Sequence, residues 1–252
     1  MFFSLDTYFP FILIRKGCFR QNPLLPLWQS LRLLISQAIK TKEALMRKKH
    51  AFSFLMAAIL AVVSTSYFLA SEAAASVSGK VIAIDAGHGG SDPGAVANGI
   101  SEKDLVLKVA AHTKDRLEEA GATVIMTRTG DVYVGLEARA ELANARNADT
   151  FVSIHANAAT PSAHGTETFH FPSSSQGQAL ASALQTELVN TLNTRNRGVK
   201  SANFSVLRNT AMPAALVELG FITNAEEAER MKAASFPNEA ATAIVRGLQQ
   251  YH

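Results

Sequence analysis

Short apolar runs alternate with amphipathic segments between residues 76 and 252, and this alternation limits the possible folds more than any other feature of the chain. Helical spacing of apolar residues occurs at about 101–121, 136–148, 176–193 and 238–250, and Thr223–Glu226 predicts the start of a further helix. Strands are predicted at Val81–Asp85, Thr123–Thr127, Phe151–His155, Thr166–Phe171, Ser205–Leu207 and Ala214–Glu218. The pattern predicts an α/β fold in a single domain: a twisted, mostly parallel sheet of about six strands with helices on both faces.

The charge of the chain is divided unevenly between its two parts. Residues 1–75 hold nine Lys or Arg and three Asp or Glu, which leaves fifteen (24 minus 9) and eighteen (21 minus 3) for residues 76–252. The net charge is therefore +6 before residue 76 and −3 after it. A folded part with a net negative charge gives no electrostatic argument for binding nucleic acid.

The first 75 residues contain a secretory pattern. Basic residues follow Met46, an apolar stretch runs from Ala51 to Ala70, and small residues at 73–75 provide a cleavage site. We therefore expect residues 46–75 to be a signal peptide and the protein to be exported, to the extracellular space, cell wall or periplasm. If this signal segment is not cleaved, it would instead anchor the protein in the membrane. No other membrane contact is expected. Residues 1–45 form a leader of doubtful status, because we expect translation to start at Met46.

Four side chains fall where a parallel sheet would gather them. His88 follows the first strand in a Gly-rich segment, His155 ends the third strand, and Glu218 lies in an apolar run. Glu102 opens the helix after the first strand, at the same predicted edge. Ligands of such sheets bind beyond the carboxyl ends of the strands, so we expect these four side chains to lie close together.

Two imidazoles and one carboxylate are the ligands of a catalytic zinc site that keeps its fourth position open for water. The only cysteine, Cys18, lies in the leader, so any metal of the folded part must be bound by His, Asp or Glu. The remaining carboxylate would then take a proton from the attacking water and return it to the leaving group. For each residue alone there is a structural alternative, such as a helix-capping role for Glu102 or a salt bridge for Glu218.

The same segments resemble the zinc-dependent N-acetylmuramoyl-L-alanine amidases of bacterial cell walls. The resemblance covers about Lys80 to Tyr251 and is carried by Asp-Ala-Gly-His-Gly-Gly at 85–90, Ser-Glu-Lys-Asp at 101–104, Ser-Ile-His-Ala-Asn at 153–157 and Val-Glu-Leu-Gly-Phe at 217–221, with further similarity at Arg139. It implies that residues 76–252 are a catalytic domain in which His88, Glu102 and His155 bind one zinc ion. It also implies that Glu218 is the catalytic carboxylate and that peptidoglycan is the substrate.

The resemblance extends to residues that would contact substrate, and it leaves alternatives open. Asn157, Glu167, Arg197 and Lys200 are expected to bind peptidoglycan, the two cations through carboxylates of the stem peptide. Only nine residues separate His155 from Gly165, too few for the blocking helix of some family members, so no activator is expected. A zinc peptidase or deacetylase acting on another wall bond, or a wall-binding protein without catalysis, remains possible from the sequence.

Overall fold

The structure is a computed structural model that describes residues 33–37, 40–41, 56–59 and 77–252. The described residues before position 60 are helical and exposed. The expected leader (1–45) and signal peptide (46–75) otherwise lie outside the described residues. None of the helices that the structure describes combines the length and the apolar character needed to cross a bilayer.

Six strands form one sheet, whose order is β4-β1-β5-β8-β6-β7. β6 runs antiparallel to β8, and every other neighbouring pair is parallel, which confirms the predicted mostly parallel sheet. A separate antiparallel pair, β2 and β3, precedes the first long helix. The strands are β1 (Val81–Ala86), β2 (Val96–Ala97), β3 (Ile100–Ser101), β4 (Thr123–Met126), β5 (Thr150–Asn157), β6 (Thr166–His170), β7 (Asn196–Ser201) and β8 (Ala214–Phe221).

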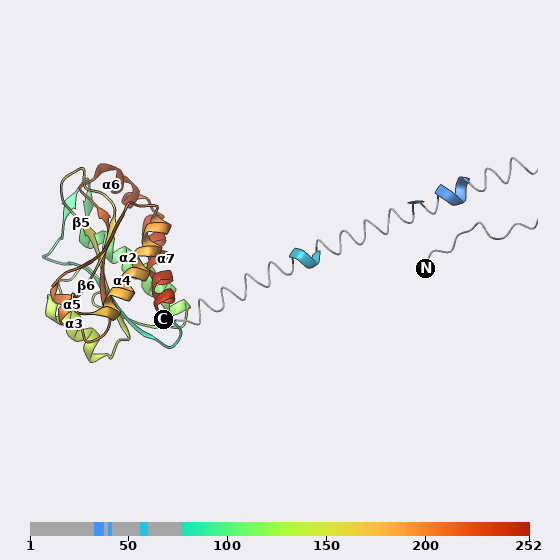
Figure 1. Cartoon of the computed structure of the whole chain (residues 1–252). Coiled ribbons are helices and arrows are strands. Elements are labelled where there is room, and N and C mark those ends of the chain that lie inside the picture. The colour runs from blue at the N-terminus through green and yellow to red at the C-terminus, as the bar shows by residue number, and fades with distance from the viewer. Residues whose placement is uncertain (1–32, 38–39, 42–55, 60–76) are drawn as a thin grey trace, which may run out of the picture. The chain divides into compact units, whose positions relative to one another are not determined.

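Helices cover both faces of the sheet, but unequally (Figure 1). The three long helices α2 (Glu102–Glu119), α4 (Ser175–Leu192) and α7 (Phe236–Tyr251) pack together on one face, with α6 (Ala225–Lys232) against α7. The other face carries only α3 (Leu136–Ala145) and the four-residue α5 (Ser205–Arg208), which pack against each other. The predicted arrangement with helices on both faces is therefore confirmed.

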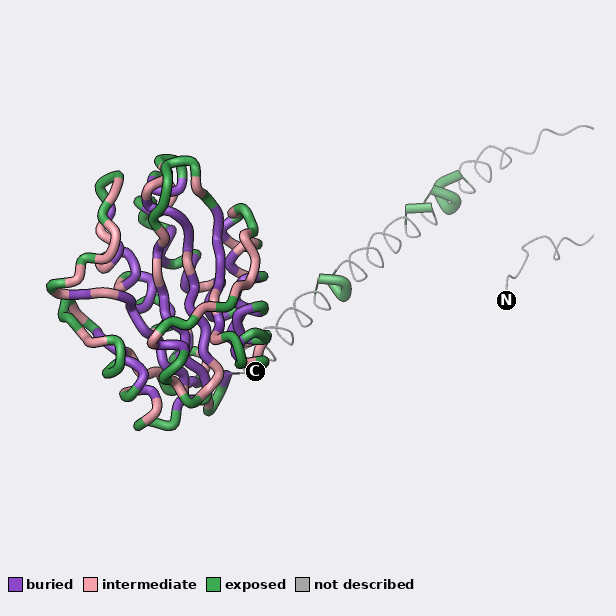
Figure 2. Tube along the Cα trace, turned by 60° about the vertical axis from the view of Figure 1, so that its left-hand side comes forward, coloured by how far each residue is buried: buried purple, intermediate pink, exposed green. Residues whose placement is uncertain are grey.

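Alternation along the central strands sends side chains into two cores. In β1, Ile82 and Ile84 join the larger core under the long helices, whereas Ala83 joins the smaller core under α3 and α5. The same division separates Val152 from Phe151 in β5. Burial on both faces explains why these strands are almost continuously apolar, and Figure 2 shows the buried trace concentrated in the strands.

The sixth strand is not where the sequence predicts it. Ser205–Leu207, predicted as a strand, lies in α5, and the strand is instead the polar segment of β7. β7 lies at the edge of the sheet, beside β6 alone, so its residues are only partly buried and need not be apolar. A pattern search for apolar runs therefore passes over it.

Three predicted helix starts also differ in detail. The Ser101 side chain makes no capping hydrogen bond, and its Oγ is buried without a partner. Asn224, rather than Thr223, caps α6, because its side chain accepts a hydrogen bond from the Glu227 N–H. The last helix begins at Phe236 with Pro237 in its first turn, two residues before the predicted start.

Candidate active site

The candidate site lies at the carboxyl edge of the sheet, on the face that α3 and α5 cover. His155 is in β5 and Glu218 in β8, where the two residues are direct neighbours across the parallel pair. Their side chains point to the same face as Phe151 and Leu216, which belong to the smaller core. Because α3 and α5 are short, they leave a cavity of about 500 Å³ open above these side chains.

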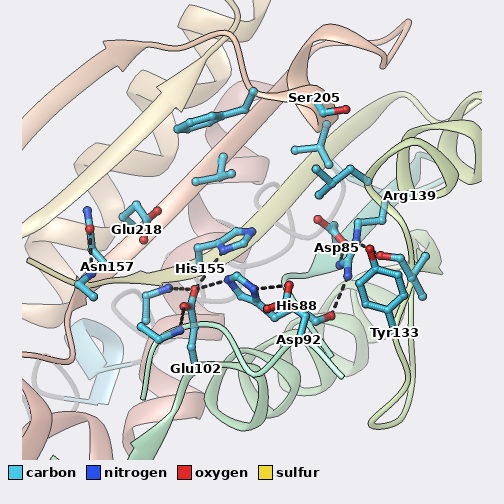
Figure 3. Close-up of a pocket in the computed structure, with 18 residues that line it drawn as sticks. Asp85, His88, Asp92, Glu102, Tyr133, Arg139, His155, Asn157, Ser205 and Glu218 are labelled. Carbon is cyan, nitrogen blue, oxygen red and sulfur yellow. Dashed lines mark hydrogen bonds and ion pairs between the residues drawn. The ribbon is translucent and has the colours of Figure 1, made fainter. Parts of the chain in front are cut away.

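The two histidines and Glu102 converge on one point. His88 Nε2 lies 3.1 Å from Glu102 Oε1, and His155 Nδ1 lies 3.0 Å from the same oxygen. One ligand atom from each of the three residues lies within 4.8 Å of the others. Figure 3 shows the three side chains meeting at the centre of the cavity. The structure therefore brings together the three residues that the sequence predicts as metal ligands.

Hydrogen bonds fix the Glu102 carboxylate in this position. Its Oε1 also accepts from the backbone N–H of Ala156, at 3.0 Å, and its Oε2 accepts from that of Ala95, at 2.9 Å. Burial of Glu102 disfavours its charge, but the hydrogen bonds from His155, His88 and Ala156 outweigh burial and hold its pKa well below the usual range. Glu102 is therefore a carboxylate at neutral pH.

His88 is oriented by a second carboxylate. Its Nδ1 lies 2.8 Å from Asp92 Oδ2, which places the ring proton on Nδ1 and leaves Nε2 facing Glu102. Burial disfavours protonation of His88, but the hydrogen bonds and charges of Glu102 and Asp92 outweigh it and raise the pKa of the ring. The ring is therefore held in the orientation that a metal ligand needs.

A buried ionic network holds the backbone of this loop. Asp85 accepts hydrogen bonds from Thr127, Ser153 and Arg139, the last at 2.7 Å. Arg139 also donates to the carbonyl oxygens of residues 86, 88 and 134, and Arg128 to those of 86, 87, 103 and 130. Both guanidinium groups are thus engaged by the protein itself.

Gly87 allows the loop to pass directly over His155. A Cβ added to Gly87 would lie 2.5 Å from His155 Nε2, well inside contact distance. Any larger residue would therefore displace the imidazole.

Glu218 has the environment of a general base. Its Oε2 is buried and makes no hydrogen bond, and the side chain lines the cavity beside His155. Burial raises the pKa of Glu218 well above its usual value, and the negative charges of Glu102 and Glu167 raise it further. A buried carboxyl oxygen without a hydrogen-bond partner lowers the stability of the fold, so its presence indicates a functional role.

The four residues expected to contact substrate form one network, which we call the Glu167 cluster. Glu167 accepts hydrogen bonds from Asn157 at 2.8 Å, from Arg197 at 2.6 Å and from Lys200 at 2.6 Å. Of the four, Asn157 lines the cavity. Glu167 is itself the cross-strand neighbour of Glu218. Two cations and one carboxylate leave the cluster with one net positive charge.

A β-bulge brings the two cations of the Glu167 cluster to the same side. Thr166 and Thr168 of β6 pair with Asn196 and Val199, so β7 contains one extra residue here. Gly198, with φ of +84°, lies inside the extra length. Residues three apart on a regular strand point to opposite faces, and the bulge instead lets Arg197 and Lys200 both reach Glu167.

Several functional neighbours were not found from the sequence. Asp92, which orients His88, stands four residues after it in the Gly-rich loop. Arg128 follows β4 and Asp85 lies near the end of β1, so the same edge rule that located the histidines would have pointed to both. The cavity lining also includes apolar and aromatic side chains that no sequence pattern singles out: Tyr133, Val134, Leu136, Phe204, Val206 and Leu216.

The donor set and geometry of the cluster fit a divalent metal ion. Three ligands of two imidazoles and one carboxylate, with a cavity above them, match a catalytic zinc site with an open position. The buried Oε2 of Glu218 has no protein partner, as expected for a group that acts on a reactant in the cavity.

Comparison with known proteins places the whole folded part in one family. The family model of N-acetylmuramoyl-L-alanine amidase matches residues 82–250. The protein YqiI of Bacillus subtilis is 46% identical over 72% of this chain and 89% of its own length. The N-acetylmuramoyl-L-alanine amidase LytC of Bacillus subtilis is 36% identical over 89% of this chain, which spans only 46% of that relative.

Solved structures show the same fold. The N-acetylmuramoyl-L-alanine amidase AmiC2 of Nostoc punctiforme superposes with a TM-score of 0.66 at 37% identity, over 69% of this chain and 98% of its own. An N-acetylmuramoyl-L-alanine amidase from Clostridium difficile 630 gives a TM-score of 0.66 at 36% identity, over 68% of this chain and 96% of its own.

Proposed function

Because the chain belongs to the N-acetylmuramoyl-L-alanine amidase family, we propose that it hydrolyses the amide between the lactyl group of N-acetylmuramic acid and L-alanine of the peptidoglycan stem peptide. We further propose that His88, Glu102 and His155 hold one zinc ion. The observation that carries the mechanism is the unpartnered Oε2 of Glu218 beside the three converging ligands. When bound, zinc would polarise the scissile carbonyl and lower the pKa of water to about 7.

Glu218 acts as the general base. Its carboxylate removes a proton from the attacking water as the water oxygen adds to the amide carbonyl carbon. The same proton is then delivered to the nitrogen of L-alanine as the carbon–nitrogen bond breaks. A raised pKa suits both halves of this cycle, because the carboxylate accepts the proton readily and holds it until the amine leaves.

The Glu167 cluster binds the peptide side of the substrate. Its net positive charge is complementary to the carboxylates of a stem peptide, and Lys200 and Arg197 are partly exposed. Asn157 connects the cluster to the cavity. Glu167 holds the other three side chains in place, so its contribution is positioning rather than direct contact.

We place the activity outside the cytoplasm, in residues 76–252, with 46–75 as the export signal and any membrane contact through that signal alone. Cell-wall relatives and the substrate support this location. β5 and β6 are joined by residues 158–165, which contain no helix to cover the cavity. We therefore expect hydrolysis of peptidoglycan without an activator protein.

Mass spectrometry of peptidoglycan digested by the zinc-loaded protein tests this proposal. We expect free stem peptides that begin with L-alanine, together with intact peptide-free glycan strands, and we expect both to disappear with a chelator. Fragments cut inside the peptide or the glycan would assign a different hydrolase, and deacetylated sugars would assign a deacetylase.

Glu218→Gln is the matched control, since it keeps the shape of the side chain and removes the base. A fall in turnover of about 10²- to 10⁴-fold with unchanged zinc content is expected. Full-rate hydrolysis by this variant would contradict the role of Glu218. Binding to the wall without any metal-dependent product from the native protein would instead indicate a non-catalytic wall-binding protein.

A further inference from the structure

The cavity has two chemically different ends. Figure 3 shows Asn157 and Glu218 on one side of the His88–Glu102–His155 cluster, and Tyr133 on the other. The Asn157 end leads to the Glu167 cluster with its net positive charge. The other end is lined by Tyr133 and its chain neighbours Val134 and Leu136, and we call these three residues the apolar wall.

The apolar wall offers no free charge to a ligand. Arg139 also lines the cavity, but its guanidinium donates all its hydrogen bonds to Asp85 and to backbone carbonyls. Asp85 is buried, and three hydrogen bonds engage its carboxylate. A ligand that fits here must therefore be uncharged and present an apolar face.

Large side chains of the apolar wall are exposed although the backbone that carries them is fixed. Tyr133 is 60% exposed and Leu136 58% exposed. The preceding loop is held by Asp131, which accepts from the Gly90 N–H at 2.7 Å and from Lys103 at 2.8 Å, and by Arg139, which donates to the carbonyl of Val134. Exposed apolar residues on a fixed loop beside a cavity are typical of a binding surface.

Phe204 lines the same cavity from a different segment, on the side of the Glu167 cluster, because its partner Phe169 is the strand neighbour of Lys200. It is 40% exposed, and its ring packs edge-on against Phe169 at 5.3 Å between centroids. Two aromatic rings fixed at the rim of one cavity provide flat apolar surfaces with a polar tip at Tyr133, which suits a ligand with an apolar face and hydroxyl edges. A pyranose ring has these properties.

We propose that the apolar wall is a sugar-binding subsite, which holds the glycan strand while the Glu167 cluster holds the stem peptide. This inference rests on the proposed function and deepens it, because it assigns the direction in which the substrate lies across the site. In the uncleaved substrate the lactyl carboxyl is consumed by the amide, so the sugar side is uncharged and matches the wall. The peptide side carries the carboxylates and matches the cations.

The test measures binding rather than hydrolysis, with one probe for each end. Chitotetraose, an uncharged oligomer of N-acetylglucosamine, probes the apolar wall, and the free stem tetrapeptide probes the Glu167 cluster. Both are titrated into the full-length protein, with and without zinc, by ligand-observed NMR. Tyr133→Ala is expected to weaken chitotetraose binding by about three- to tenfold, whereas Tyr133→Phe keeps it within about twofold of wild type.

Val132→Ala is the matched control, because Val132 is 54% exposed on the same loop but does not line the cavity. It should leave binding of both probes unchanged, and Tyr133→Ala should leave binding of the tetrapeptide unchanged. Lys200→Met should give the reverse pattern, with weaker tetrapeptide binding alone. Thermal unfolding of each variant separates a loss of binding from a loss of fold.

The proposal is overturned if chitotetraose does not bind, if Tyr133→Ala binds it like the wild type, or if that variant loses both probes equally. It is also overturned if the Tyr133→Ala change abolishes self-association at increasing concentration and leaves saccharide binding intact, since the wall would then be a surface for a second copy. Chitotetraose contains no stem-peptide amide, so these outcomes are independent of which bond the enzyme cleaves.

Discussion

At Glu218, the requirements of catalysis and of stability oppose each other. Its Oε2 is buried without a partner, and burial together with the charges of Glu102 and Glu167 raises its pKa. The proposed base, which must be ionised to act, is therefore held where ionisation is unfavourable. The fold tolerates this because other groups at the site, such as Asp85 and Glu102, are fully paired.

We expect Glu218→Gln to stabilise the metal-free protein at neutral pH. When the pKa of a carboxyl group is higher in the folded than in the unfolded state, the free energy of unfolding falls as the pH rises from the unfolded-state pKa to the folded-state pKa. The native protein in chelator should therefore lose stability as pH rises above the ordinary glutamate range. The variant should lose less, which denaturant unfolding at a series of pH values will measure. A stability difference that does not depend on pH would contradict this explanation.

Asp85 and Arg139 form a buried ion pair whose role is to position others. The side chains of Asp85 and Arg139 are 1% and 3% exposed, and the pair connects β1 to α3 beside the loop that carries His88. Because Arg139 also donates to the His88 carbonyl, breaking the pair would disturb the metal ligand as well as the fold.

Asp85→Asn should destabilise the protein by about 3–5 kcal/mol, since it leaves the buried Arg139 without its countercharge. Asp131→Asn is the matched control, because Asp131 also pairs with a cation, Lys103, but is 51% exposed; its cost should be about 0–1 kcal/mol. Urea unfolding of both variants checks the difference, and equal costs would show that burial of the pair is unimportant.

At the scale of elements, the bulge in β7 converts an edge strand into part of the site. Deleting Gly198 would restore a regular strand and turn either Arg197 or Lys200 away from Glu167. We expect the deletion to raise KM for peptidoglycan more than it lowers kcat, since we propose that the cluster binds substrate, and Glu218 is left in place.

Gly198→Ala tests the same strand without changing its register. No atom lies within 4 Å of an added Cβ, so the cost is the strain of a positive φ, about 1–2 kcal/mol. This variant should unfold more readily but keep KM. If the deletion and the substitution changed KM equally, the bulge would not be what aligns the two cations.

Elements that are buried on both faces could be predicted from the sequence, and those defined by their neighbours could not. β1, β5 and β8 are apolar runs because both of their faces are covered. β7 is polar because it lies at the edge of the sheet. α5 is so short that its first three residues, Ser205–Leu207, resemble a strand in sequence. The histidines and Glu218 were located by the rule that carboxyl ends of parallel strands meet. Contacts such as Arg139–Asp85 join residues more than fifty positions apart and leave no local pattern.

On the scale of the whole molecule, zinc would join three separate segments of the chain: the loop after β1, the start of α2 and the end of β5. The ligands are far apart in the unfolded chain, so zinc should bind the folded state much more tightly. A free zinc concentration 100 times the dissociation constant should add about 2.7 kcal/mol to the free energy of unfolding.

The zinc affinity should fall as pH decreases through the raised pKa of His88, because the proton competes with the metal for Nε2. Below that pKa the imidazole of His88 is cationic and cannot bind zinc. Thermal unfolding at fixed zinc and several pH values measures the effect. An unchanged zinc-dependent rise in Tm at acidic pH would exclude His88 as a ligand.

The last strand of the sequence, β8, occupies a place inside the sheet, between β5 and β6. A chain that stops short of residue 214 therefore lacks both Glu218, the proposed general base, and the strand that joins the two halves of the sheet. Such a fragment has nothing with which to cut a cell wall. The residues of the candidate site therefore come together only when β8 is in place between β5 and β6.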